Sequence, residues 1–260
     1  MDTRPVGIFD SGMGGVSLLR DARLLLPNEN FIFYGDNKNA PYGDKTEEEI
    51  LSLTSAAADF LLDHGVKALV LACNTATSAS INILRKKLAV PVVSIEPAIK
   101  PACERAGDGK VFMLATAATT QLARYRALLE RMPDPARVVN IGISGMVARV
   151  ERGITSVGAY DDILDTYLAP YFGETADAIV LGCTHYVFIG EAIREYFLRR
   201  MKGECRLYDG NRATARQLGR VLERFDLLNP YGSGEVCFET SGNRKKLAPI
   251  FDNFINTPVE

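Results

Sequence analysis

The stretch Lys67-Ala-Leu-Val-Leu-Ala-Cys73-Asn-Thr75 has a counterpart in the second half of the chain, Asp177-Ala-Ile-Val-Leu-Gly-Cys183-Thr-His185. Each runs from a charged residue through a short apolar run to a cysteine and a polar pair. The apolar runs have the length and β-rich composition of strands buried in a parallel sheet. Ligands of such sheets bind beyond the carboxyl ends of the strands, where Cys73 and Cys183 stand. Two equivalent thiols facing one ligand from opposite sides suit a reaction that removes a proton from one face of a carbon and returns one to the other.

Strand-like and helix-like segments alternate along almost the whole chain, a pattern typical of parallel sheets flanked by helices. We expect strands at residues 6–9, 31–34, 69–72, 90–94, 111–114, 138–141, 178–181 and 236–239. We expect helices near residues 16–26, 46–64, 75–87, 120–131, 160–171, 190–200, 213–225 and 245–255. Because no low-complexity linker separates the two halves, we expect them to pack face to face with the cysteines at the seam.

Composition restricts the class of protein. The 260 residues are 47% hydrophobic and 24% charged, with a formal net charge of −2, as is ordinary for a soluble globular protein. This near-neutral charge gives no reason to expect nucleic acid or an anionic membrane as a partner. No apolar run reaches the ~18 residues of a membrane span. The N-terminus enters its first strand without a signal-peptide hydrophobic region, so we expect a cytoplasmic location.

The cysteines and histidines argue against disulfide and metal chemistry. The five cysteines are scattered and form no Cys-x-x-Cys pair, unlike a disulfide framework or a zinc site. Only His64 and His185 are present, which excludes a histidine-rich metal centre, and His64 fits a helix C-terminus. Since there is also no sign of a pyridoxal lysine site, we expect neither a metal nor a cofactor. The remaining thiols are expected to be small buried hydrophobes, at Cys103, Cys205 and Cys237.

A glycine-rich turn, Asp10-Ser-Gly-Met-Gly-Gly15, follows the first expected strand. A dinucleotide fingerprint counted from Gly12 would need glycine at the position of Ser17, and the turn has no P-loop lysine. What remains is a tight turn at a helix N-terminus, whose free backbone N–H groups suit a small anion such as a carboxylate. Asp10 and Ser11 would point into the same crevice, although Asp10 could instead only cap the helix.

These residues belong to a set of motifs that runs the full length of the chain. The set comprises Gly7-Ile-Phe-Asp10-Ser-Gly-Met-Gly-Gly15, Tyr34-Gly-Asp36, Pro41-Tyr42-Gly43, Ala72-Cys73-Asn74-Thr75-Ala76, Glu96-Pro97-Ala98-Ile99-Lys100-Pro101, Val150-Glu151-Arg-Gly153, Leu181-Gly-Cys183-Thr184-His185-Tyr186 and Thr240-Ser-Gly242. In combination it resembles the motifs of the glutamate racemases, cofactor-independent members of the aspartate/glutamate racemase superfamily.

The resemblance implies an α/β fold of two pseudo-symmetric domains, each a mainly parallel sheet flanked by helices, with the active site at the domain interface. The first domain would comprise residues 1–95 plus 206–260, and the second residues 96–205. The implied function is interconversion of L- and D-glutamate by a two-base, two-cysteine proton transfer at the α-carbon, which supplies D-glutamate for bacterial peptidoglycan. The expected partner is therefore glutamate, and we also consider a homodimer.

This chemistry asks for two bases on opposite faces of the substrate. A free thiol with a pKa near ~8.5 can be poised as thiol or thiolate by its surroundings. The resemblance assigns Cys73 to the D-face and Cys183 to the L-face, with Asp10 beside the first thiol and with Glu151 and His185 assisting the second. Asp36 falls on a further acidic position of the family. The implied substrate-binding residues, mainly for the carboxylates and the amine, are Asp10, Ser11, Tyr42, Gly43, Asn74, Thr75, Thr184 and His185.

Several of these residues also have a purely structural interpretation. A cysteine in a buried strand is most often a packed core residue, although two in duplicated contexts favour catalysis. Glu151 could be a surface glutamate, His185 a structural histidine, and Tyr42 could simply shape a turn after proline.

The chain also departs from the family pattern. Val187 stands where proline is usual, and the segments 115–119 and 209–211 differ from the usual residues. A racemase of aspartate or another amino acid therefore stays open. So does a non-catalytic amino-acid-binding regulatory module, although both cysteine motifs are intact. A single-thiol decarboxylase or isomerase is disfavoured because both thiols are present.

Overall fold

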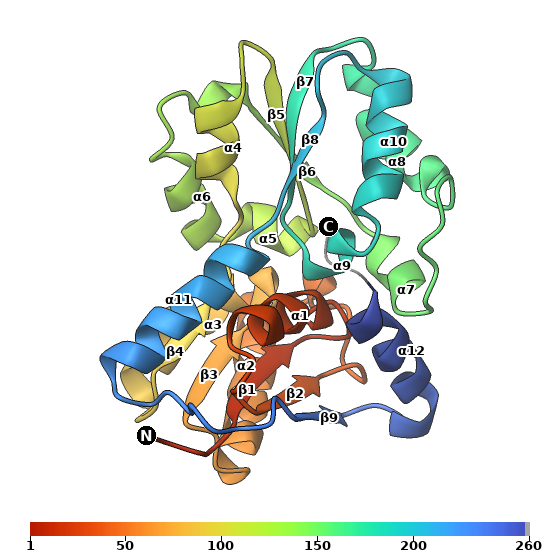
Figure 1. The fold of residues 1–260 in the computed structure, drawn as a ribbon. Coiled ribbons are helices and arrows are strands. Elements are labelled where there is room, and N and C mark those ends of the chain that lie inside the picture. Colours follow the sequence, from red (N-terminus) through yellow and green to blue (C-terminus); the bar gives the residue numbers. More distant parts are fainter. Residues whose placement is uncertain (258–260) are drawn as a thin grey trace.

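The computed structural model describes residues 1–257, whose strands form two fully parallel sheets of five and four strands (Figure 1). The first sheet has the order β4-β3-β1-β2-β9. Its strands are β1 (Val6–Asp10), β2 (Phe31–Gly35), β3 (Ala68–Leu71), β4 (Val92–Ser94) and β9 (Val236–Thr240). The second sheet has the order β6-β5-β7-β8. Its strands are β5 (Lys110–Ala115), β6 (Val138–Gly142), β7 (Ala176–Leu181) and β8 (Arg206–Tyr208).

The two sheets share one topology. The order β2-β1-β3-β4 in the first sheet corresponds to β6-β5-β7-β8 in the second, so that in each the strand that comes second along the chain lies at one end. Strand β9 is an addition beside β2. The strands that carry the two cysteine stretches, β3 and β7, are therefore in equivalent positions. This confirms the expected α/β fold with two parallel sheets and its internal duplication.

Helices cover the sheets and fill the space between them (Figure 1). They are α1 (Val16–Leu25), α2 (Glu47–Asp63), α3 (Asn74–Lys87), α4 (Ile99–Arg105), α5 (Ala117–Gln121), α6 (Ala123–Leu129), α7 (Met146–Val150), α8 (Asp161–Leu168), α9 (Thr184–Val187), α10 (Gly190–Arg200), α11 (Asn211–Arg224) and α12 (Arg244–Asn256). Three 3-10 turns complete the elements, at Tyr42–Asp44, Pro135–Arg137 and Ala169–Tyr171.

The predicted helix boundaries hold best where capping signals are strong. Thr46 and Glu49 form a reciprocal capping box at the start of α2, and His64 is the C-cap residue of that helix. The helix expected near 120–131 is instead divided into α5 and α6 at Leu122. The helix expected near 160–171 ends as α8 at Leu168, because the 3-10 turn that follows contains proline, which has no N–H to donate.

The chain passes between the two sheets twice, after β4 and after β8. Gly210 lies against the first passage: a Cβ atom there would be 2.4 Å from the backbone oxygen of Glu96. The predicted domain boundary before residue 206 is too early, since β8 pairs with β7 of the second sheet. The strand was missed because Arg206-Leu-Tyr208 lacks the apolar run that marks the other buried strands. After Tyr208 the chain returns to the first sheet, where α11 packs against α1.

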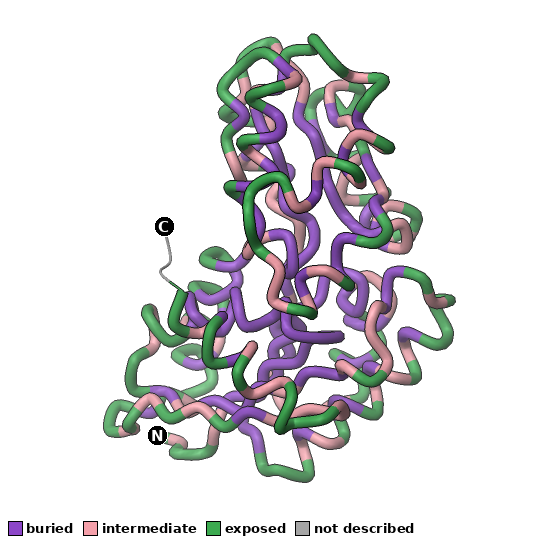
Figure 2. The backbone as a smooth tube through the Cα atoms, turned by 90° about the vertical axis from the view of Figure 1, so that its right-hand side faces the viewer, coloured by how far each residue is buried: buried purple, intermediate pink, exposed green. Residues whose placement is uncertain are grey.

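Each sheet with the helices that cover it forms one lobe: the first lobe contains β1–β4 and β9, and the second contains β5–β8. Buried backbone runs through the centre of both lobes, and exposed backbone lies at the periphery (Figure 2). The residues that open the two cysteine stretches fix the starts of their strands. Buried Lys67 forms an ion pair with Glu29 at 2.6 Å, while Asp177 accepts a hydrogen bond of 2.8 Å from the Gly109 N–H. Of the thiols without a motif, Cys205 is buried as expected. The expectation is wrong for Cys237, which is exposed on β9 because that strand is the edge of its sheet.

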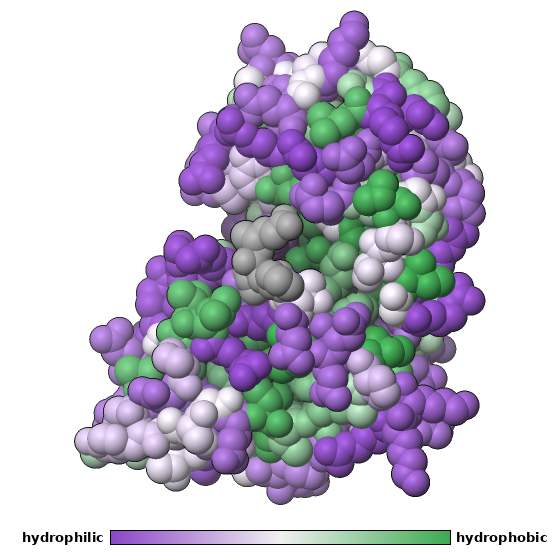
Figure 3. Space-filling view, turned by 45° about the vertical axis from the view of Figure 1, so that its right-hand side comes forward, coloured by the Kyte–Doolittle hydropathy of each residue, from purple (hydrophilic) through white to green (hydrophobic). Residues whose placement is uncertain are grey.

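The molecular surface is mainly hydrophilic on the face shown in Figure 3, with hydrophobic side chains in separate small groups. Among residues 1–257, the helices are too short or too polar to cross a membrane.

Candidate active site

The two cysteines occupy equivalent backbone positions at the junction of the two lobes. Cys73 follows β3 and is the N-cap residue of α3, where its Sγ accepts a hydrogen bond of 3.5 Å from the Ala76 N–H. Cys183 follows β7 and is the N-cap residue of α9. Their exposed fractions are 6% and 7%. The duplicated sequence pattern thus corresponds to a duplicated position in space.

Both thiols line one cavity of about 10 Å³, about the smallest volume that can hold a single water molecule. Its lining includes most of the residues expected at the site: Ser11, Tyr42, Gly43, Cys73, Asn74, Thr75, Cys183, Thr184 and His185. The other two expected residues, Asp10 and Glu151, lie behind this lining and bind Thr184 and His185. Sequence reasoning gave no site role to the remaining lining residues, Pro41, Thr116 and Val147.

The surroundings of Cys73 favour the neutral thiol. Its Sγ lies 3.4 Å from the Ser11 hydroxyl oxygen. Burial and the nearby negative charge of Asp10 raise the pKa of Cys73 to about 12, against the opposing effect of the Ser11 and Ala76 hydrogen bonds. In the absence of substrate, burial and Asp10 therefore hold Cys73 as the neutral thiol.

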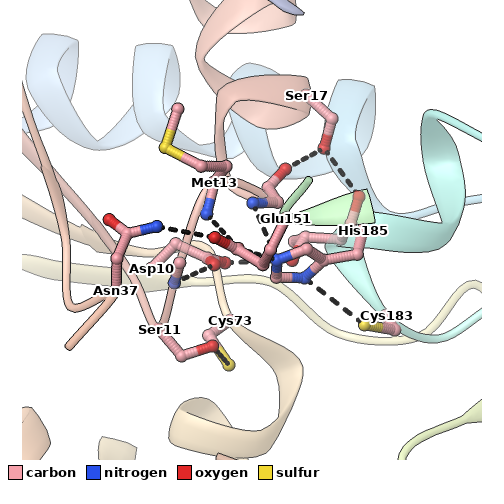
Figure 4. Close-up of polar contacts among 12 residues, drawn as sticks. Asp10, Ser11, Met13, Ser17, Asn37, Cys73, Glu151, Cys183 and His185 are labelled. Atoms are coloured by element: carbon pink, nitrogen blue, oxygen red, sulfur yellow. Dashed lines mark hydrogen bonds and ion pairs between the residues drawn. The ribbon is translucent and has the colours of Figure 1, made fainter. Parts of the chain in front are cut away.

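Cys183 contacts a histidine that is itself paired with a carboxylate. Its Sγ lies 3.8 Å from Nδ1 of His185, whose Nε2 is 2.5 Å from Oε1 of Glu151 (Figure 4). Burial lowers the pKa of His185, but the hydrogen bonds to Cys183 and Glu151 outweigh it and leave the pKa well above its ordinary value. The protonated ring then donates Nε2–H to Glu151 and Nδ1–H to Cys183. The Gly14 N–H, 3.2 Å from the same Nε2, can bond to that nitrogen only when the nitrogen carries no proton.

Glu151 is the C-cap residue of α7 in the second lobe, yet its carboxylate is held by the first. Oε1 accepts a hydrogen bond from the Met13 N–H at 2.7 Å, and Oε2 accepts one from Nδ2 of Asn37 at 2.7 Å. Burial raises the pKa of Glu151, but the contacts with His185 and the N–H donors outweigh it and hold the pKa below its usual value. The surface interpretation of Glu151 is therefore wrong.

In the glycine-rich turn, the Met13 N–H binds the carboxylate of Glu151 from the opposite lobe. The turn also requires its glycines for close approach. A Cβ atom on Gly12 would lie 2.1 Å from Oε1 of Glu151, and one on Gly14 would lie 2.4 Å from Nδ1 of His185. The turn thus leaves room for the side chains of Glu151 and His185 from the opposite lobe.

Asp10 ends β1 and links the lobes rather than capping α1. Its Oδ1 accepts from the Gly12 N–H at 2.9 Å, and its Oδ2 accepts from the Thr184 hydroxyl at 3.0 Å. The N-cap residue of α1 is Gly15, without a side-chain cap, so the capping interpretation of Asp10 is wrong. Complete burial raises the pKa of Asp10 to about 6, against the opposing charge of His185.

Tyr42 and Asp36 form a buried pair beyond the carboxyl ends of the strands of the first sheet. The Tyr42 hydroxyl donates to Oδ2 of Asp36 at 2.7 Å, and the Ser241 hydroxyl donates to Oδ1 at 2.5 Å. Tyr42 does begin a 3-10 turn, but it also lines the cavity. The adjoining Gly43 lies against the second lobe, because a Cβ atom there would be 2.6 Å from that of Thr116.

A hydroxyl cluster closes the cavity between the lobes. The Oγ1 atoms of Thr75, Thr116 and Thr119 are each 2.9 Å from the other two. Thr116 and Thr119 were noted in the sequence only as part of a departure from the family pattern. The only signal that could have found them is the position of Thr116 at the carboxyl end of β5.

Two other departures lie away from the cavity lining: Val187 ends α9, and Asp209 accepts a hydrogen bond from the Asn211 N–H at the second passage between the lobes. Within residues 1–257, no three His, Cys, Asp or Glu side chains are grouped so that they could hold a metal ion.

The family model for Asp/Glu/Hydantoin racemase matches residues 18–218. The chain belongs to this family. It is 41% identical over 257 residues to a glutamate racemase of Clostridium botulinum, strain Kyoto, covering 98% of each protein. It is 41% identical over 239 residues to a glutamate racemase of Ralstonia pickettii, covering 92% of this chain and 83% of that protein.

Solved structures of the family have the same fold. A glutamate racemase of Thermus thermophilus with β-chloro-D-alanine aligns with a TM-score of 0.81 at 32% identity, covering 100% of this chain and 96% of that one. A glutamate racemase of Francisella tularensis with D-glutamate aligns with a TM-score of 0.83 at 28% identity and the same coverage. This family member is therefore an amino-acid racemase, and its two-sheet architecture is that of the solved glutamate racemases.

Proposed function

We propose that this racemase interconverts L- and D-glutamate through Cys73 and Cys183, and that it supplies D-glutamate for peptidoglycan in the cytoplasm. The observation that carries the mechanism is that two buried thiols from equivalent strands line one cavity. The relatives named above are glutamate racemases, and a further one, from Escherichia coli, was solved with L-glutamate. These similarities support glutamate over aspartate as the substrate.

In the L-to-D direction, the Cys183 thiolate removes the α-proton and the electron pair of the C–H bond stays on the α-carbon. Cys73, held as a thiol by burial and by Asp10, donates its proton to the opposite face. The reaction leaves Cys183 protonated and Cys73 ionised, so the D-to-L direction begins from that state. His185, charged and paired with Glu151, stabilises the thiolate form of Cys183.

The cavity lining offers groups for the polar ends of glutamate. Oδ1 of Asn74 is buried and has no hydrogen-bond partner among the described residues, so it is an acceptor for the ammonium group. The hydroxyls of Thr75 and Thr116 can turn from their mutual bonds to donate to a carboxylate. Thr184 is held by Asp10 at the Cys183 side of the cavity.

The cavity is too small for an amino acid, so substrate entry requires the lobes to separate. Opening would break the contacts that join them, including those from Thr184 to Asp10 and from Glu151 to Met13. The substrate is then enclosed when these contacts reform, and exclusion of water strengthens the electrostatic interactions around the thiols.

The test is incubation of the protein with L-glutamate or L-aspartate in D₂O, after exhaustive dialysis with a chelator. We expect loss of optical activity and uptake of deuterium at the α-carbon with glutamate, and far slower change with aspartate. Faster turnover of aspartate would support the alternative substrate, and binding without exchange would support a regulatory module. Activity that returns only on adding a metal or pyridoxal phosphate would contradict the cofactor-independent mechanism. Sedimentation of the same sample tests whether the protein is a homodimer.

A further inference from the structure

Asn37 lies in the loop after β2, and its amide joins the end of β9 to the carboxylate of Glu151. Oδ1 accepts a hydrogen bond of 2.7 Å from the Thr240 hydroxyl, and Nδ2 donates one of 2.7 Å to Oε2 of Glu151. The Thr240 oxygen itself accepts from the Gly242 N–H at 3.0 Å. In this arrangement the Thr240 hydrogen is directed to Oδ1 of Asn37, and the amide presents its Nδ2 donor to the carboxylate of Glu151.

The backbone around Asn37 makes room for this amide. A Cβ atom on Gly35, the last residue of β2, would lie 2.7 Å from Oδ1 of Asn37. A Cβ atom on Gly242 would lie 3.2 Å from the Asn37 Cβ. Both strand ends that flank the amide therefore lack side chains where it sits, and the late Thr240-Ser-Gly242 motif acquires a structural purpose.

The hydrogen bonds that reach Glu151 favour its ionised form. Its carboxylate receives donors from Met13, Asn37 and His185. Because Asn37 offers only N–H at this contact, it stabilises the ionised carboxylate and cannot accept a proton from it. An ionised Glu151 keeps the imidazolium of His185 aimed at Cys183, as the line of contacts in Figure 4 shows.

We propose that Asn37, oriented by Thr240, is a positioning residue for the Cys183 half of the reaction. It holds Glu151 ionised and in place, and Glu151 holds His185 against Cys183. The inference rests on the proposed two-thiol function and deepens it. The hydrogen-bond contacts of Cys73, among the described residues, are with Ser11 and Ala76. Neither contact involves Asn37 or Glu151, so we expect its half of the reaction to be independent of Asn37.

The test uses the two enantiomers of β-chloroalanine, since elimination requires only one proton abstraction. One thiolate takes the α-proton, the C–H electron pair forms the double bond, and chloride leaves with the electrons of the C–Cl bond. Water then hydrolyses the 2-aminoacrylate to pyruvate and ammonium, and pyruvate is measured. The L-enantiomer reports Cys183 and the D-enantiomer reports Cys73.

In Asn37→Ala we expect elimination from the L-enantiomer to fall about tenfold and elimination from the D-enantiomer to stay within about twofold, the range expected for losing one hydrogen bond to a charged group. Thr240→Val should shift the same ratio less, and Thr240→Ser should restore it. Asn39→Ala is the matched control, because the Asn39 amide lies in the same loop but donates to Asp36. It should change both rates by one common factor.

Equal losses for both enantiomers, an unchanged ratio, or a greater loss for the D-enantiomer would overturn the role of Asn37. If Asn37→Ala does not fold, the Thr240 pair decides the question alone, since an unchanged ratio in Thr240→Val would then count against the inference. Racemisation of glutamate by the unmodified protein is measured in parallel. Its absence would defeat the proposed function, whereas its presence with an unselective Asn37→Ala would defeat only this inference.

Discussion

Cys73 and Cys183 have the same place in the fold and different chemical surroundings. Each follows the third strand of its sheet, begins a helix and is nearly buried. Cys73 faces a hydroxyl and a nearby carboxylate, from Ser11 and Asp10, whereas Cys183 faces an imidazolium. Duplication of the sheet therefore accounts for the positions of the thiols, while the loops around them account for their protonation.

The support of the two thiols differs as well. The hydrogen-bond partners of Cys73 come from its own lobe, namely Ser11 and Ala76. Cys183 is contacted by His185 and, through it, by Glu151, both from its own lobe. The carboxylate of Glu151 in turn accepts hydrogen bonds from donors of the opposite lobe. Separation of the lobes would thus remove the donors from Glu151, while the hydrogen-bond partners of Cys73 would stay in place.

The largest effect should come from exchanging either thiol for a hydroxyl. Cys73→Ser and Cys183→Ser should each slow racemisation in both directions by roughly 10²–10⁴, because a hydroxyl is far less acidic than a thiol and each direction uses both groups. Elimination from β-chloroalanine should survive selectively. Cys73→Ser should retain the L-enantiomer and lose the D-enantiomer, and Cys183→Ser should do the reverse.

Cys103→Ser is the control for these variants, since Cys103 is only partly buried and lies on α4, outside the cavity lining. It should racemise like the unmodified protein. Two variants that lose the same enantiomer, or either one racemising at the unmodified rate, would show that the thiols do not act as opposed bases.

Asp10→Asn should separate stability from catalysis on the Cys73 side. Burial raises the pKa of Asp10 from 3.8 to about 6, so the folded state binds this proton more tightly than the unfolded state. The stability that Asp10 contributes is fully present below pH 3.8 and is lost as the pH rises through 6. The neutral amide of Asp10→Asn does not lose this stability. Above pH 7 the free energy of unfolding of the variant should therefore exceed that of the parent by at most about 3 kcal/mol. Racemisation by the variant should fall.

Urea unfolding of both proteins at pH 4 and pH 8 measures this difference. The free energies of unfolding should nearly coincide at pH 4 and favour Asp10→Asn at pH 8. The comparison between variant and parent matters because burial also raises the pKa of Asp21 to about 6, which gives both proteins a common pH dependence. A variant that is less stable than its parent at pH 8 would show that Asp10 is worth more as an anion than its burial costs.

Local patterns predicted much of this architecture and less of the site. The alternating segments and the cysteine repeat were sufficient for the parallel sheets and for the placement of both thiols at strand ends. The helices α4, α7 and α9 were not found, because helices of seven residues or fewer contain too few turns for a 3.6-residue periodicity. Strand β8 was not found because Arg206-Leu-Tyr208 lacks the apolar run that marks the other buried strands. The roles assigned to the site residues came from the family resemblance and remain predictions.

Contacts between distant segments were beyond the sequence patterns. Glu151 occurs in a composition common at helix ends, and only the folded chain shows its carboxylate against Met13 and Asn37. The cluster of Thr75 with Thr116 likewise joins two lobes. In each case the local sequence is ordinary, and the function depends on which loops the two sheets bring together.

Ser11→Ala should have the smallest effect and sharpens the comparison from the Cys73 side. The Ser11 hydroxyl lies 3.4 Å from Cys73 and lowers the pKa of that thiol, against the burial that raises it. Its loss should slow elimination from D-β-chloroalanine by about fivefold relative to the L-enantiomer, the effect of one modest hydrogen bond. If Ser11 acts only by binding substrate, both enantiomers should instead lose affinity equally and the ratio should not move. The expected shift is opposite in sign to that of Asn37→Ala, so the two variants together show whether each thiol has its own set of supporting residues. The double variant Ser11→Ala/Asn37→Ala tests this directly. Its ratio of the two elimination rates should return toward that of the parent while both rates are lower, because the two sets of residues act on different thiols.

A ratio that stays displaced in the double variant would mean that Ser11 and Asn37 influence the same group.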